Sequence, residues 1–116
     1  MGDIWHTVMA DGDLAAEASH AACLGGWYVL LWRGPHGVHA VNDRCTHQAA
    51  RLSGGRVRRG AVMCPLHGAR FDLASGKCLG GPYPDARVFA TRIVDGMIAV
   101  AVPDTPPGMA DLPIPV

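Results

Sequence analysis

Short apolar runs alternate with turn-forming residues along most of the chain, and helix-length amphipathic periodicity is almost absent. The turns between the runs predict strands over residues 21–24, 27–33, 38–42, 56–59, 61–63, 70–73, 88–94 and 97–102. Two-residue turns at Gly25-Gly26 and Asp95-Gly96 predict hairpins. Only residues 11–17 predict a short turn of helix. Several short strands at this spacing indicate an all-β domain, either a sandwich or a barrel.

Two short segments between the predicted strands carry the candidate chemistry. Cys45-Thr46-His47 has the pattern Cys-x-His, and sixteen residues later Cys64-Pro65-Leu66-His67-Gly68 contains Cys-x-x-His. Each segment offers one thiolate and one imidazole. Four such ligands in two similar loops can hold one metal centre between them.

Two other kinds of site use the same residue types. A mononuclear zinc ion binds Cys and His, but structural zinc sites usually pair Cys with Cys and His with His, whereas each segment here mixes the two types. A nucleophilic Cys–His pair needs only one Cys, and nothing in the sequence supplies an orienting third group with a recognisable signature. The pattern favours a metal centre with mixed ligands, and zinc stays open as the alternative.

Two thiolates and two imidazoles are the ligand set of a Rieske 2Fe–2S cluster. From about residue 27 to about residue 102 the sequence resembles the Rieske family, and Pro65 and Gly68 also match that family's second ligand loop. The resemblance implies one 2Fe–2S cluster per chain, with the cysteines on the inner iron and the histidines on the outer iron. The implied ligands are Cys45, His47, Cys64 and His67.

This ligand set affects the charge of the implied cluster. With two thiolates and two neutral imidazoles, the oxidised site is neutral and the reduced site carries one negative charge. Four thiolates would leave three negative charges after reduction. Because self-repulsion is smaller, His ligation raises the reduction potential above that of plant-type ferredoxins.

The resemblance also implies the fold and its boundaries. In the Rieske fold, a small cluster-binding lobe is inserted into an antiparallel β-sandwich or barrel base. We expect one Rieske domain over residues 1–102, with the lobe at about residues 43–83. Residues 103–116 contain five prolines in fourteen positions and predict a tail that is extended along the surface or disordered.

Four positions distinguish this chain from the high-potential members of the family. The quinol-oxidising members bridge their ligand loops by a disulfide, and the matching positions here are Ala50 and Leu66. Those members also place two hydroxyl donors near the cluster, where this chain has Ala69 and Phe71. Because donors stabilise the added negative charge, their loss lowers the potential. The resemblance therefore implies the small ferredoxin of an aromatic-ring-hydroxylating dioxygenase system.

Such a ferredoxin is an electron carrier and not an enzyme. It takes single electrons from a flavin-dependent ferredoxin reductase and passes them to a terminal oxygenase. The alternative is the Rieske-like small subunit of an assimilatory nitrite reductase. We expect partners to dock on the tip of the ligand loops. The resemblance implies that a third loop covers the cluster there, and Gly80-Gly81-Pro82 has the composition for it. The tip residues are Gln48, Ala49, Leu66, Pro82 and Tyr83, with Arg51 nearby.

Composition and charge restrict the partners. The 116 residues include ten basic and ten acidic side chains, and a formal net charge of zero argues against nucleic acid or a membrane surface. The N-terminus has no signal-peptide pattern, and residues 27–32, the longest strongly apolar run, are too few to span a bilayer. We expect a cytoplasmic protein.

The remaining cysteines and histidines are not expected to take part in the chemistry. A reducing cytosol favours free thiols at Cys23 and Cys78, with Cys23 buried as a small residue in a strand. The other four histidines have no ligand-like spacing and are expected at the surface or at its rim: His6, His20, His36 and His39.

Overall fold

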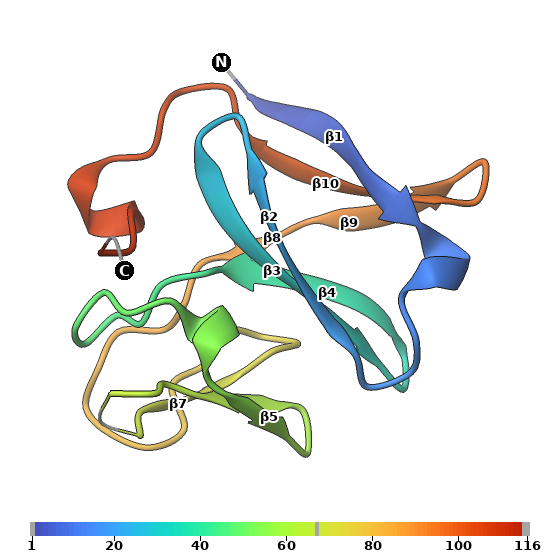
Figure 1. Ribbon diagram of the computed structural model, residues 1–116. Coiled ribbons are helices and arrows are strands. Elements are labelled where there is room, and N and C mark those ends of the chain that lie inside the picture. The colour runs from blue at the N-terminus through green and yellow to red at the C-terminus, as the bar shows by residue number, and fades with distance from the viewer. Residues whose placement is uncertain (1, 67, 115–116) are drawn as a thin grey trace.

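The computed structural model describes residues 2–66 and 68–114 (Figure 1). In this part of the chain there are ten strands and three short 3₁₀ helices. The strands are β1 (Asp3–Ala10), β2 (Ser19–Leu24), β3 (Trp27–Gly34), β4 (Gly37–Asn42), β5 (Arg56–Arg58), β6 (Ala61–Met63), β7 (Arg70–Asp72), β8 (Val88–Phe89), β9 (Thr91–Val94) and β10 (Met97–Pro103). The 3₁₀ helices are η1 (Asp11–Asp13), η2 (Leu52–Gly54) and η3 (Met109–Asp111).

The strands form three antiparallel sheets. Their orders are β1-β10-β9, β2-β3-β4-β8 and β5-β6-β7. Figure 1 shows the first two sheets together as a base and the third, small sheet at the far end from β1 and β10. The prediction of an all-β fold is confirmed.

Strand β3 separates two apolar cores. Val29 and Leu31 face the core of the base, whereas Leu30 and Trp32 face a second core shared with the small sheet. A strand buried on both faces has an uninterrupted apolar sequence rather than an alternating one. The apolar run at residues 27–32 therefore reflects a central strand, and it joins the base to the lobe that carries the candidate ligands.

Both predicted two-residue turns are present. Gly25 and Gly26 have φ values of 57° and 89°, and Asp95 and Gly96 have values of 52° and 76°. A type I′ hairpin turn requires positive φ at both central positions, which explains why these pairs favour it. The predicted helical turn is present only as the three residues of η1.

Two features of the base differ from the prediction. The single strand predicted over residues 88–94 is wrong: the chain changes sheets at Ala90, so that β8 pairs with β4 and β9 pairs with β10. Strand β1 was not predicted, and its pairing with β10 contains an irregularity between Thr7 and Met9. A bulge shifts later side chains to the opposite face, which hides the alternation that marks a strand.

The C-terminal segment follows the surface of the domain. Asp104 N–H donates to the Gly2 carbonyl at 3.0 Å, and the Trp27 indole Nε1–H donates to the Thr105 carbonyl at 3.0 Å. Figure 1 shows the segment leaving β10 and passing along the side of the base. None of the helices in the described residues is long and apolar enough to cross a membrane.

Candidate metal centre

The first ligand loop, residues 45–50, is closed by two backbone hydrogen bonds. Cys45 N–H donates to the Ala50 carbonyl at 2.8 Å, and Ala49 N–H donates to the Cys45 carbonyl at 2.8 Å. Ala49 has a φ of 61°, which is uncommon for a residue that carries a side chain. Such conformations cluster at functional sites, where the surrounding structure maintains them.

The second ligand loop, residues 64–69, repeats this hydrogen-bond pattern. Cys64 N–H donates to the Ala69 carbonyl at 2.7 Å, and Gly68 N–H donates to the Cys64 carbonyl at 3.1 Å. Gly68 occupies the position that Ala49 has in the first loop and has a φ of 74°, which glycine adopts without steric cost. The two loops therefore present their cysteines on the same backbone framework, although their sequences differ.

The two loop cysteines are buried in the same core. Cys45 is 0% exposed and Cys64 is 2% exposed, and Leu52 and Phe71 belong to the core that surrounds them. Neither forms a disulfide. Two buried thiols on matching loops thus fit the inner iron of a 2Fe–2S cluster.

The structure describes only one of the two predicted histidine ligands. His47 is exposed, and its ring stacks on Tyr83 with 4.1 Å between centroids and 17° between planes. His67 lies outside the described residues. Among the described residues no three His, Cys, Asp or Glu side chains gather around one point. The four-ligand site as a whole therefore stays a prediction.

A third segment lies against the first ligand loop. Tyr83 contacts His47 by the ring stacking described above, and Thr46 Oγ donates to the Pro84 carbonyl at 2.6 Å. Gly81 approaches the Tyr83 ring so closely that a Cβ added there would be 2.6 Å from a ring carbon. Small residues at this position therefore let the tyrosine lie beside the histidine.

A buried carboxylate that sequence reasoning missed supports the first loop. Asp43 is 1% exposed, and its two carboxylate oxygens accept hydrogen bonds from Ser53 N–H and Ser53 Oγ, each at 2.6 Å. Its own N–H donates to the Tyr28 carbonyl at 2.8 Å. Asp43 precedes the loop and Ser53 follows it, so this contact joins the two ends of the loop. Ten residues separate the pair, and no local motif in the sequence indicates their contact.

The C-terminal segment also supports the first loop, which the sequence did not indicate. Asn42 Nδ2 donates to the Asp111 carbonyl at 3.1 Å, Arg44 Nε donates to the Leu112 carbonyl at 3.0 Å, and Ile114 N–H donates to the Ala49 carbonyl at 2.8 Å. These partners lie on both sides of Cys45. The tail therefore belongs to the surroundings of the candidate site.

The other cysteines and histidines agree only in part with expectation. Cys23 and Cys78 are free thiols, as predicted. Cys23 is exposed, however, so the prediction that it is buried is wrong. Strand β2 lies at an edge of its sheet, and alternate residues on such a strand face solvent. The histidines His6, His20, His36 and His39 are exposed or half-buried, as expected.

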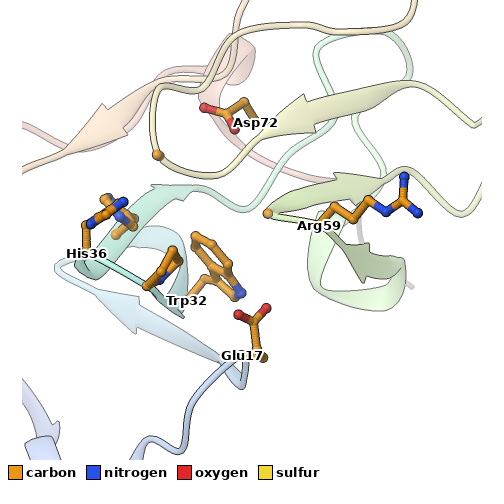
Figure 2. Close-up of a pocket in the computed structure, with 9 residues that line it drawn as sticks. Glu17, Trp32, His36, Arg59 and Asp72 are labelled. Atoms are coloured by element: carbon orange, nitrogen blue, oxygen red, sulfur yellow. The ribbon is translucent and has the colours of Figure 1, made fainter.

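A separate depression of about 340 Å³ lies where the base meets the small sheet (Figure 2). Its lining contains both acids and bases, including Glu17, His36 and Asp72, and none of the described ligand-loop residues. The Trp32 Nε1–H is buried there without a hydrogen-bond partner. This mixture of acidic and basic side chains with one unpaired indole N–H does not indicate a particular ligand or reaction. The ligand loops are therefore the better candidate for the functional site.

Comparisons with known proteins agree with the loop geometry. Residues 4–103 match the family described as the Rieske [2Fe-2S] domain. The chain is 36% identical over 100 residues to the "Anthranilate 1,2-dioxygenase ferredoxin subunit" of Burkholderia cepacia, covering 84% of this chain and 92% of that relative.

Two solved structures are also similar. The first is a chain from the "Complex of reduced oxygenase and oxidized ferredoxin in carbazole 1,9a-dioxygenase", with 28% identity, a TM-score of 0.78, and coverage of 84% of this chain and 93% of that one. The second is described as an NADH-dependent nitrite reductase small subunit from Mycobacterium tuberculosis, with 30% identity, a TM-score of 0.74, and coverage of 86% and 96%. The match over residues 4–103 includes both ligand loops, and the chain therefore belongs to the Rieske [2Fe-2S] domain family.

Proposed function

We propose that this protein is an electron-transfer ferredoxin that carries single electrons on one Rieske 2Fe–2S cluster. The observation that carries the proposal is the matching pair of ligand loops, each with a buried cysteine at its first position. Cys45 and Cys64 would bind the inner iron, and His47 and His67 the outer iron. When bound, the cluster supplies a site that accepts and releases one electron.

The surroundings of the loops suit this role. The cysteines lie inside the apolar core, whereas His47 is exposed beside Tyr83. This arrangement keeps water from the sulfur ligands and leaves an imidazole at the surface, which is the shortest protein path to a partner. Transient contact at this tip suits a carrier that binds and releases a partner in every turnover.

The residues around the second loop favour a low reduction potential. Ala69 is 3% exposed and Phe71 is 0% exposed, so apolar groups occupy the positions where high-potential members have hydroxyl donors. Without those donors the negative charge of the reduced state is less stabilised. The proposed partners are a flavin-dependent reductase as donor and a terminal ring-hydroxylating oxygenase as acceptor. The names of the similar anthranilate and carbazole dioxygenase proteins support this proposal.

A second candidate function is that of a small subunit of an assimilatory nitrite reductase. It is favoured by the similarity to the Mycobacterium tuberculosis structure, which covers 86% of this chain. The two functions differ in how long the protein stays bound to its partner. A carrier should purify from its native cells as a free protein, whereas a subunit should stay bound to a larger reductase polypeptide in constant proportion.

The proposed function is tested by ligand variants with a matched cysteine control. Cys45→Ser and Cys64→Ser each remove a proposed ligand, and each should abolish the visible absorption of the cluster and reversible reduction by one electron per chain. Cys23→Ser removes an exposed free thiol and should leave both unchanged. Retention of a normal spectrum and normal reduction by both ligand variants would reject the assignment.

A further inference from the structure

The charges of this neutral chain are unevenly distributed. Between Asp43 and Asp72 the sequence contains no acidic residue, yet it holds six of the ten basic residues of the chain. These are Arg44, Arg51, Arg56, Arg58, Arg59 and Arg70. The segment that contains both ligand loops is therefore positively charged, although the formal net charge of the protein is zero.

The register of the small sheet places two of these arginines on one row. Arg56 pairs with Met63, and Met63 pairs with Arg70, so the three side chains lie side by side across β5, β6 and β7. All three are exposed, whereas Val62 and Phe71 in the neighbouring row point into the core. Since adjacent strands are about 4.8 Å apart, the Cα atoms of Arg56 and Arg70 are separated by roughly 10 Å.

Two further arginines extend this positive surface. Arg58 is exposed on the next outward-facing row, and Arg59 is exposed in the turn that follows it. Figure 2 shows the Arg59 side chain pointing away from Trp32, and Arg59 lines both the depression at Trp32 and the one between the arginines. We call the set of Arg56, Arg58, Arg59 and Arg70 with Met63 the arginine face.

The positive charges of the arginine face are not neutralised within the described chain. No carboxylate in residues 2–66 and 68–114 forms an ion pair with any of its four arginines. The nearest acid in the sheet register is Asp72, across Ala61 from Arg58, and its Oδ2 accepts hydrogen bonds from Ser75 N–H and Oγ. The guanidinium groups are therefore available to an external carboxylate.

Apolar groups lie between the charges. Met63 is 45% exposed and Leu79 is 46% exposed, and both line a depression of about 740 Å³ together with the arginines. Leu79 is held there because its N–H donates to the Arg70 carbonyl at 2.8 Å. Arginine and methionine are enriched in protein–protein interfaces, and guanidinium groups bind carboxylates in a bidentate manner. Exposed apolar side chains between the arginines favour a protein surface over a phosphate backbone.

We propose that the arginine face is a docking surface for a carboxylate-rich patch on a protein electron-transfer partner. Met63 immediately precedes Cys64, and Arg70 immediately follows Ala69, so a partner on this face lies next to the second ligand loop. The inference rests on the proposed electron-transfer function and assigns the charge of the partner. The arginine face would give the partner a charged surface to bind beside the nearly uncharged tip. Charge attraction of this kind raises association rates by roughly 10- to 1,000-fold.

The test uses two redox proteins of opposite charge as probes. The protein with its cluster is reduced with dithionite, and its second-order reaction with acidic cytochrome b5 is compared with its reaction with basic cytochrome c. At about 10 mM ionic strength, where the Debye length is roughly 30 Å, R56E/R70E should slow the reaction with cytochrome b5 about tenfold or more. It should speed the reaction with cytochrome c. At about 1 M salt both effects should vanish.

A second double variant controls for net charge. R87E/R92E makes the same change in total charge, but Arg87 and Arg92 lie outside the small sheet, over the rings of Trp27 and Trp5, and Arg87 also pairs with Asp111 at 3.5 Å. This variant should change the rate with cytochrome b5 less than threefold. Amide chemical shifts on adding cytochrome b5 should change at residues 56–63, 70 and 79. Equal slowing by the two double variants, no slowing by R56E/R70E, or shift changes confined to the base would overturn the proposal.

The same experiment separates this inference from the proposed function. If the protein bound no cluster, dithionite would reduce none of the variants and the chemical shifts would still report docking. If the cluster is reduced normally but the rates are insensitive to the arginines, the electron-transfer function stands and the arginine face is rejected.

Discussion

The contact between Asp43 and Ser53 predicts a specific loss of stability. Ser53→Ala removes the hydroxyl that donates to the Asp43 carboxylate at 2.6 Å and keeps the backbone N–H that donates to the other oxygen. The carboxylate is 1% exposed, so water does not readily replace the lost donor.

The expected size of the effect follows from the charge and burial of the acceptor. A hydrogen bond to a charged group contributes about 1.5–3 kcal/mol, and a buried acceptor that loses its donor bears the full cost of desolvation. For a domain of this size, 1 kcal/mol lowers the melting temperature by roughly 4 °C. We therefore expect Ser53→Ala to lower the melting temperature by about 6–12 °C.

The chain contains a matched control for this prediction. Ser75 makes the same two kinds of bond, from N–H at 3.0 Å and from Oγ at 2.6 Å, to the carboxylate of Asp72 at an exposed site. Water can replace the Ser75 hydroxyl, so Ser75→Ala should cost less than about 1 kcal/mol. Thermal unfolding followed by circular dichroism measures both variants. Equal losses in the two variants, or no loss in Ser53→Ala, would refute the argument from burial.

Three further predictions concern the reduction potential of the cluster, the C-terminal segment and the close backbone approach at Gly55. Ala69→Ser combined with Phe71→Tyr should raise the midpoint potential by up to roughly 100 mV in a redox titration, because two hydroxyl donors would stabilise the reduced state; an unchanged potential would contradict the role of the missing donors. Truncation after Pro103 should speed amide hydrogen exchange in the first ligand loop more than in the second, and equal exchange would contradict a supporting tail. Gly55→Ala should lower the melting temperature by several degrees, because its Cβ would lie 1.8 Å from the Met63 carbonyl oxygen; unchanged melting would contradict that close approach.

The chemistry of the site and the local turns could be predicted from the sequence because their signals are local. Gly25-Gly26 and Asp95-Gly96 adopt the positive φ values that a hairpin turn requires, and both pairs were identified as turns. The two ligand loops were likewise located from Cys45 and Cys64 and their neighbouring histidines. Each of these signals lies within five consecutive residues.

The features that were missed depend on contacts between distant residues. Asp43 meets Ser53, and Ile114 N–H meets the Ala49 carbonyl, without any periodic relation in the sequence. Residues 88–94 read as one strand because β-propensity does not show where a chain leaves one sheet for another. Strand β1 was hidden by the irregularity in its pairing with β10.

The most direct test of the account is the metal and sulfide content of the protein purified without oxygen. A Rieske cluster on Cys45, His47, Cys64 and His67 requires about two iron and about two acid-labile sulfide per chain, in a reddish-brown protein. The Cys45→Ser variant should contain far less of both, and the Cys23→Ser variant should contain the same amounts as the original protein. A colourless protein with about one zinc per chain and no sulfide would contradict the central claim.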